Sequence, residues 1–346
     1  MAAYTTIDDP SAHFKVQLYT GNGSANHAIT FDDTDTDMQP DLVWIKNRDA
    51  TDAHCVFDNV RGATKLLSTN SGAKESTDAD TLDSFTSDGF QVDADVKVNT
   101  NTEKYVAWCW KGANGTATNT AGDVDSTVSA NTTSGFSIIK ADPGSSTGDL
   151  TIGHGLGIVP SLFIWKDVAD PNFDQNWQVY HIGTTSGLMR LNDTNVRNAD
   201  VTFWNTHTTT LIDMSSHMYQ QNLASVGYVF APVQGFSAMG SYEGNGNADG
   251  TFVYTGFRPA WVMTKSIDST SSWHIFDNKR EGYNVDNDAL VAEATTVEAT
   301  ADQIDLLSNG FKLRITTDPN VAETYIYAAF AEAPFVNSNG VPCNAR

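Results

Sequence analysis

The chain has 346 residues, with 42 acidic and 20 basic side chains, so its formal net charge is −22. The hydrophobic fraction of 40% is enough to build buried cores, and the composition therefore predicts a folded protein. The charge argues against nucleic acids and anionic membranes as partners, because both are bound by clusters of Lys and Arg. The sequence has neither the run of about 18 apolar residues that a membrane helix needs nor a visible signal peptide.

The first third of the chain predicts a series of short strands. A Gly-Asn-Gly turn at 21–23 precedes an apolar run at 42–45, which follows Pro40 and ends at Lys46. Such runs are rich in β-branched and aromatic residues and are bounded by Gly, Asn, Asp and Pro, which is typical of strands. Further strands are expected at 55–58, 90–98 and 105–110, and a helical segment is expected at 77–85.

The next segment, residues 112–132, differs in composition from what precedes it. It consists almost entirely of Gly, Ala, Asn, Thr, Ser and Asp. This is the composition of a flexible spacer. We therefore expect a linker here, with a first unit at 1–111 before it.

The same order of blocks returns twice after the linker. A proline, five mostly apolar residues and a lysine span 40–46, 160–166 and 259–265. A Phe-Asp-Asn block whose arginine lies 15 residues after the lysine occurs in the first and last copies, and a Gly-Phe block follows it. Each copy closes on an aromatic strand that begins at Tyr105, Tyr228 or Tyr325.

This spacing predicts a threefold internal duplication, with further units at 133–234 and 235–346. We expect an all-β fold of three tandem antiparallel β-sandwich units, resembling jelly rolls or lectins. A single closed assembly of three lobes, such as a β-prism or small propeller, is the alternative that spacing does not separate from it. The second and third units abut, so we expect them to pack as a rigid pair, with a second helical segment at 296–307.

No known catalytic motif is present, and we therefore expect that the protein is not an enzyme. The acidic residues Asp33, Asp35 and Asp37 resemble the first ligands of a calcium loop. Met38 and Trp44 stand where an EF-hand has Gly and Glu, which excludes that motif. A looser Ca²⁺ site and a plain solvated loop remain as interpretations, and no other cofactor is expected.

Two acid–base pairs recur at the same place in the first and third units. Asp58 precedes Arg61 by three residues, as Asp277 precedes Arg280. The pair can brace its turn, with the carboxylate accepting backbone N–H groups. Alternatively, the loop contacts a ligand and the arginine forks to a sugar or a carboxylate.

Eight tryptophans also suggest sugar binding, because aromatic faces stack on sugar CH groups. Four of them lie inside apolar blocks and are expected in cores. The other four are the surface candidates, and Trp204 lies in the most divergent segment of the second unit, where binding is expected. The core group is Trp44, Trp108, Trp165 and Trp261, and the surface group is Trp110, Trp177, Trp204 and Trp273.

Five long blocks resemble a family of virion structural proteins encoded by marine tailed bacteriophages, notably those of cyanobacteria. The resemblance covers nearly the whole chain and implies a particle component of the tail-fibre-like kind, without catalytic residues to transfer. The second unit departs from the pattern because it lacks the Phe-Asp-Asn block, and no fibrous shaft is present. The matching blocks are 40–49, 57–62, 105–110, 256–265 and 325–335.

The resemblance implies a location on the virion, on the tail or the capsid exterior, after synthesis in the host cytoplasm. We expect a tail-fibre or receptor-binding component that contacts host surface glycans and forms a homo-oligomer, specifically a trimer, beside other virion proteins. A capsid decoration or vertex protein is the first alternative. A glycan depolymerase is the second, and it requires a pair of carboxylates in a groove.

Overall fold

The computed structural model describes residues 3–31, 36–169, 176–184, 187–199, 206–216, 218–281, 284 and 286–343. Over this part of the chain the protein is all-β, as the sequence predicted, and its helices are three single turns. These turns are η1 (Pro10–Ala12), α1 (Val96–Asn99) and η2 (Ile182–Thr184).

The two helical segments expected before the Gly-Phe blocks are wrong. The structure has strands there, β7 (Leu82–Thr86) and β24 (Ala299–Leu307). Each is the first arm of a hairpin that returns through the Gly-Phe strand, β8 (Gly89–Val92) or β25 (Gly310–Leu313). Leu82 of β7 and Ile304 and Leu306 of β24 are buried in the cores, and this tertiary burial overrides the weak helical preference of the segments.

Three antiparallel sheets form the body of the molecule, and each contains four strands in the same order. The first sheet is β1-β9-β3-β4, the second contains β12-β18-β14-β15, and the third contains β19-β26-β21-β22. In each, the first and third of these strands flank the closing strand of the repeat. Their bounds are β1 (Phe14–Thr20), β3 (Leu42–Asn47), β4 (Cys55–Asp58), β9 (Lys104–Trp110), β12 (Phe136–Ala141), β14 (Leu162–Asp167), β15 (Gln178–His181), β18 (Ser225–Phe230), β19 (Ser237–Glu243), β21 (Phe257–Ser266), β22 (His274–Asp277) and β26 (Thr324–Pro334).

The strand register corrects one detail of the repeat. The anchor lysines Lys46, Lys166 and Lys265 pair with Val106, Val226 and Ile326. The second closing strand therefore matches the others from Ser225 onward, and Tyr228 corresponds to Trp108, not to Tyr105. The sequence comparison aligned Tyr228 with Tyr105 because both are tyrosines. The hydrogen-bonded register aligns residues by their partners on the neighbouring strand.

An outer layer of strands lies on each large sheet. In the first unit it is the separate sheet β2-β8-β7, and in the second it is β13-β17. In the third unit the hairpin β24-β25, with β20 at its edge, continues the large sheet through β23. Alternate residues of the first two pairs fill separate cores between small and large sheet. The remaining strands are β2 (His27–Thr30), β5 (Lys65–Leu66), β6 (Ser76–Thr77), β10 (Ala117–Asn119), β11 (Ser126–Asn131), β13 (Leu150–Gly153), β16 (Met189–Arg190), β17 (Leu211–Met214), β20 (Phe252–Tyr254) and β23 (Asp286–Val291).

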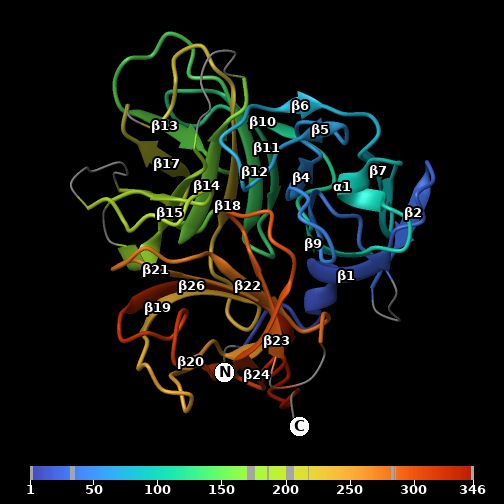
Figure 1. Ribbon diagram of the computed structural model, residues 1–346. Helices are drawn as coiled ribbons and strands as arrows, with labels where there is room; N and C mark the ends of the chain where they lie inside the picture. The colour runs from blue at the N-terminus through green and yellow to red at the C-terminus, as the bar shows by residue number, and fades with distance from the viewer. Residues whose placement is uncertain are drawn as a thin grey trace.

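The three sheet systems surround a common centre. Figure 1 shows the first third of the chain in blue to cyan, the second in green to yellow, and the third in orange to red, as three masses that meet in the middle. One hydrophobic cluster contains residues of all three, including Trp110, Phe230 and Phe330, which occupy the same register position in their closing strands. The inner faces of the large sheets therefore pack against one another.

The segment at 112–132 is not the flexible spacer that its composition predicted. Strand β11 pairs with β12 along its whole length, and β10 adds to the outer edge of β11. Val124, Val128 and Ser129 are buried. Small residues at the other positions left the hydrophobic pattern too sparse to show the strands. The first unit is consequently fixed to the second.

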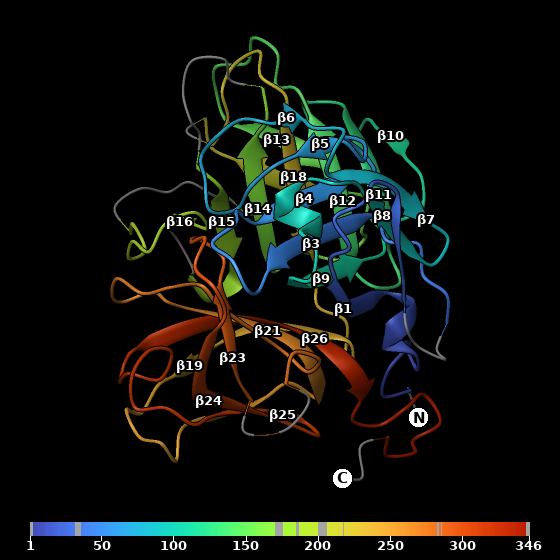
Figure 2. The same ribbon diagram turned by 45° about the vertical axis from the view of Figure 1, so that its right-hand side comes forward.

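The two ends of the described chain meet beside the third sheet system, as Figure 2 shows. The Tyr4 hydroxyl donates to the Gly256 carbonyl at 2.8 Å, and the Ser338 N–H donates to the Asp8 carboxylate at 2.7 Å. The N-terminal segment of the first unit therefore lies against the third unit. Each unit contacts both of the others, which differs from the expected rigid pair of the second and third units.

Candidate functional site

The first Asp–Arg pair lies at the junction of the first and second units. Asp58 ends β4, and one of its carboxylate oxygens accepts the N–H groups of Val60 and Arg61 at 3.1 and 2.9 Å. The other oxygen accepts Arg61 Nε at 2.5 Å and the hydroxyl of Tyr228, from β18, at 2.8 Å. The Arg61 and Asp58 side chains are 1% and 0% exposed. The pair braces its turn and contacts the neighbouring unit through Tyr228, and its burial favours the interpretation as a brace over a ligand-contact loop.

The second pair repeats this geometry between the third and first units. Asp277 accepts the N–H groups of Lys279 and Arg280, each at 3.1 Å, and Arg280 Nε at 2.6 Å. The place of Tyr228 is taken by Trp108 of β9, whose Nε1 donates to the Asp277 carboxylate at 3.0 Å. The Arg280 guanidinium also lies over the Trp108 ring, 5.9 Å from its centroid. The buried contacts of this pair therefore also favour the interpretation as a turn brace.

At the third junction, between the second and third units, a histidine replaces the pair. His181 is opposite Leu162 in the sheet, as Asp58 is opposite Leu42. Its Nδ1 accepts the Gly183 N–H at 3.0 Å, so the proton is on Nε2, which donates to the Tyr327 carbonyl at 2.9 Å. Burial lowers the pKa of His181 to about 4, so the ring is neutral at pH 7.

His181 bonds to a backbone carbonyl because Ala328 offers no side-chain donor at this third junction. The residue that corresponds to Trp108 and Tyr228 is Ala328, which has no side-chain donor. A carboxylate facing it would be buried without that partner, at a cost of several kcal/mol. A neutral histidine instead supplies a donor for the available carbonyl.

A second set of contacts crosses the same junctions one residue before β4, β15 and β22. His54 Nε2 is 3.0 Å from the Val291 carbonyl, and burial lowers the pKa of this histidine to about 3, so it donates as a neutral ring. Trp177 Nε1 donates to the Ser68 carbonyl at 2.9 Å, and Trp273 Nε1 donates to the Arg190 carbonyl at 2.8 Å. Both tryptophans are 1% exposed, so their expected place on the surface is wrong.

The anchor lysines are buried at the ends of the inner strands. The Nζ atoms of Lys46, Lys166 and Lys265 donate to the carbonyl of the next residue at 2.6, 2.8 and 2.9 Å. Burial lowers the pKa of Lys46 and Lys265 to about 8. The lysine of the repeat motif therefore has a structural role, since it satisfies carbonyl groups where the strands meet the junctions.

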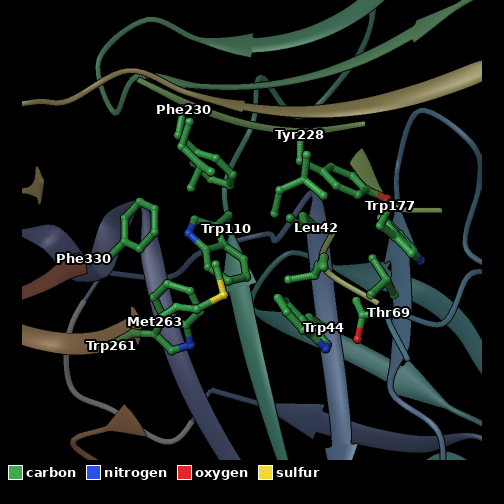
Figure 3. A pocket seen from close by; sticks show the side chains of 14 residues that line it. Leu42, Trp44, Thr69, Trp110, Trp177, Tyr228, Phe230, Trp261, Met263 and Phe330 are labelled. Atoms are coloured by element: carbon green, nitrogen blue, oxygen red, sulfur yellow. The ribbon is translucent and has the colours of Figure 1, made fainter. Parts of the chain in front are cut away.

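The centre of the molecule is closed to ligands. Figure 3 shows Trp44, Trp110, Phe230, Trp261 and Phe330 converging from the three large sheets. The space left between them is about 30 Å³, enough for a single water but not for an organic ligand. Trp110, which sequence analysis placed among the surface candidates, is 3% exposed and lies in this cluster.

Most of the acidic loop that resembles a calcium site is not described by the structure. Asp33 and Asp35 lie outside the described residues, and Asp37 is an exposed residue just after them. Within the described ranges, no group of three or more His, Cys, Asp or Glu side chains is placed to hold a metal ion. A carboxylate cage at this loop remains a sequence-based expectation.

A surface groove of mixed polar and apolar lining lies on the second unit. It measures about 560 Å³ and is lined by residues of the segment 188–199, including Arg190, Asp193 and Arg197. Arg190 Nη1 is 3.7 Å from the Asp193 carboxylate, and Arg197 Nη1 donates to the Thr184 carbonyl at 2.8 Å. Trp204 itself lies outside the described residues. The groove presents guanidinium and amide groups that can hydrogen-bond a polar ligand.

Replacing His181 with glutamine is expected to change how stability depends on pH. An unfolded histidine titrates near pH 6.5, whereas folded His181 titrates near 4, so the unfolded chain binds more protons between these values. Between pH 7 and pH 5 the wild type should lose about 2 kcal/mol relative to His181→Gln. Urea unfolding at both pH values measures the difference. A gap that stays constant with pH would show that His181 is not a neutral buried donor.

The fold and its junctions define an all-β protein in which three sheet systems with the same strand order close around one core. The described residues include no helix long and apolar enough to cross a membrane. A family model described as a domain of unknown function, DUF7483, matches residues 9–334. The chain therefore belongs to this family. Searches of curated proteins and of solved structures gave no match.

Proposed function

We propose that this chain is a non-enzymatic structural protein of a phage particle, a tail-fibre or receptor-binding head that contacts host surface glycans. Its fold, in this proposal, consists of three tandem β-sandwich repeats closed into one body. The resemblance of its residue blocks to those of marine phage virion proteins supports the assignment to a particle. The closed arrangement of the repeats supports a structural role, because it makes the body rigid.

The junctions are the observation that supports a structural role best. Asp58, Arg61, Asp277 and Arg280 are the buried charged groups that first suggested a site, and all four bind the chain itself. Polar groups held in this way stabilise a rigid body and are not available for turnover. A rigid body with exposed loops and outer sheets is what a surface-presented binding head requires.

The three internal repeats offer an alternative to the expected trimer of chains. Three repeats in one chain already form the head-to-tail contacts that three subunits of a cyclic trimer would form. One chain can therefore supply a threefold head, and further oligomerisation would use outer surfaces. Sedimentation velocity of the purified protein distinguishes a monomeric head from a trimer of heads.

The position of the chain on the particle tests the assignment. Electron cryo-microscopy of intact virions, with antibody against this chain as a second label, should place density at the tail tip or tail fibres. Density on the shell would reject receptor binding in favour of a capsid decoration or vertex protein. Release of reducing ends from host polysaccharide by the purified chain would instead support a depolymerase.

A further inference from the structure

An aromatic pair lies exposed on the outer sheet of the third unit. Phe252 and Tyr254 are alternate residues of β20, the edge strand of that sheet, and they are 44% and 56% exposed. Val253 between them is buried in the core. Residues two apart on a strand share one face about 6.7 Å apart, so the two rings stand side by side on the solvent face.

The first unit offers an internal comparison for these positions. In its outer sheet Ala28 pairs with Gln91 and Thr30 pairs with Gly89. In the third unit Phe252 pairs with Lys312 and Tyr254 pairs with Gly310. The same register thus holds small residues in one repeat and large aromatic residues in the other. The strand pairing is therefore the same in both repeats, whereas the side chains on its solvent face differ in size and chemistry.

The orientation of the Tyr254 ring is fixed by the N-terminal segment. The Tyr4 hydroxyl donates to the Gly256 carbonyl at 2.8 Å and lies 3.3 Å from the Tyr254 hydroxyl. Because the proton of Tyr4 is used, Tyr254 is the donor between the two hydroxyls. A ring held in this way is pre-organised and loses little freedom when a ligand stacks on it.

Paired charges border the rings on the same sheet. Lys312 Nζ is 2.5 Å from the Asp249 carboxylate, and Arg314 Nε is 3.4 Å from the Asp305 carboxylate. These groups offer both donors and acceptors with no net local charge. Together with the aromatic rings, these groups suit a neutral ligand that has many hydroxyl groups and one apolar face. Sugars have both properties.

The size of the patch favours a sugar chain over a protein partner. Two half-exposed aromatic side chains present about 200 Å² in total, given that each buries about 150–250 Å² when covered. A stable protein interface needs about 800 Å² on each partner. The net charge of −22 disfavours nucleic acid and anionic lipid, the other ligands that stack on or insert aromatic rings.

We propose that Phe252 and Tyr254 form a carbohydrate-binding platform for neutral polysaccharide chains on the outer sheet of the third unit. This inference rests on the proposed function and places its glycan contact on a sheet face, away from the groove of the second unit. Sugar rings would stack on the two aromatic faces while their hydroxyls hydrogen-bond to Lys312 and Asp249.

The experiment uses affinity electrophoresis of the full chain through gels that contain one soluble polysaccharide each. The probes are hydroxyethyl cellulose, glycol chitin, xylan and mannan as uncharged or weakly charged chains, and alginate as an anionic one. The platform variant is Phe252→Ala with Tyr254→Ala. The matched control is Val96→Ala with Ile158→Ala, which truncates two exposed apolar side chains of the first and second units and leaves the platform intact.

We expect retardation of the wild type by at least one of the first four polysaccharides and none by alginate. The platform variant should lose affinity at least tenfold at an unchanged melting temperature, and the Val96→Ala, Ile158→Ala control should bind as the wild type does. No retardation of the wild type, equal retardation of the platform variant, or loss of a self-associated species in that variant would each overturn the platform. These outcomes are separate from the location of the chain on the virion, which tests the proposed function.

Discussion

Replacing Arg61 with methionine is expected to lower the free energy of unfolding by about 3–5 kcal/mol. The substitution removes the partner of Asp58 while the carboxylate stays fully buried, and an uncompensated buried charge is among the costliest single defects. It also removes donors to the Val56 carbonyl and to Glu75. Chemical denaturation followed by circular dichroism at pH 7 measures the loss.

Two further substitutions calibrate this result. Arg258 forms an ion pair with Glu332 at 2.8 Å on the surface, so Arg258→Met should cost less than about 1 kcal/mol. Tyr228→Phe removes one hydrogen bond to Asp58 and should cost about 1.5–3 kcal/mol. If Arg61→Met proved as mild as Arg258→Met, the junction would not depend on its buried charges.

Replacing Trp110 with alanine is expected to cost about 3–5 kcal/mol and to weaken all three units together. Its ring is 4.9 Å from that of Phe14, and 6.1, 5.7 and 5.6 Å from those of Phe230, Trp261 and Phe330, between centroids. The substitution therefore opens a cavity where the sheets of three repeats meet. The free energy of unfolding from urea titration measures the cost.

The shape of that titration is as informative as its midpoint. With a shared core, tryptophan fluorescence and far-ultraviolet circular dichroism should give one coincident transition in both wild type and Trp110→Ala. Phe85→Ala, at a partly exposed position of the first outer sheet, is the control and should cost less. Separate transitions for the two probes would contradict a single cooperative body.

Much of the fold was predictable because the chain repeats itself. Strand chemistry around Pro40, Pro160 and Pro259 indicated an all-β protein, and the spacing of the blocks indicated a threefold repeat. The segment at 112–132 escaped because Thr, Ser and Ala can form strands without an apolar pattern. Register, which decides that Tyr228 matches Trp108, depends on hydrogen bonding between distant strands.

The candidate site was less predictable, for a reason specific to closed repeats. Trp177 and Trp273 resemble surface residues because each precedes a short strand in polar surroundings, but their partners come from a different repeat. For Asp58 and Asp277 the sequence left a turn brace and a ligand contact as alternatives, and the role as a junction acceptor was not visible without the neighbouring unit. Phe252 and Tyr254 were overlooked, although comparison with Ala28 and Thr30 in the first unit marks them as exceptional.

The three junctions show what a single chain gains over three identical subunits. In a symmetric trimer one mutation alters all three interfaces at once. A change from tryptophan to alanine at the position of Trp108 would then occur at every interface. Here the contacts at Asp58, Asp277 and His181 are encoded separately, and His181 faces Ala328 without affecting the other two junctions. Each lobe can therefore acquire its own surface while the three lobes stay closed around their centre, and the exposed aromatic side chains Phe252 and Tyr254 of the third lobe are one result of that freedom.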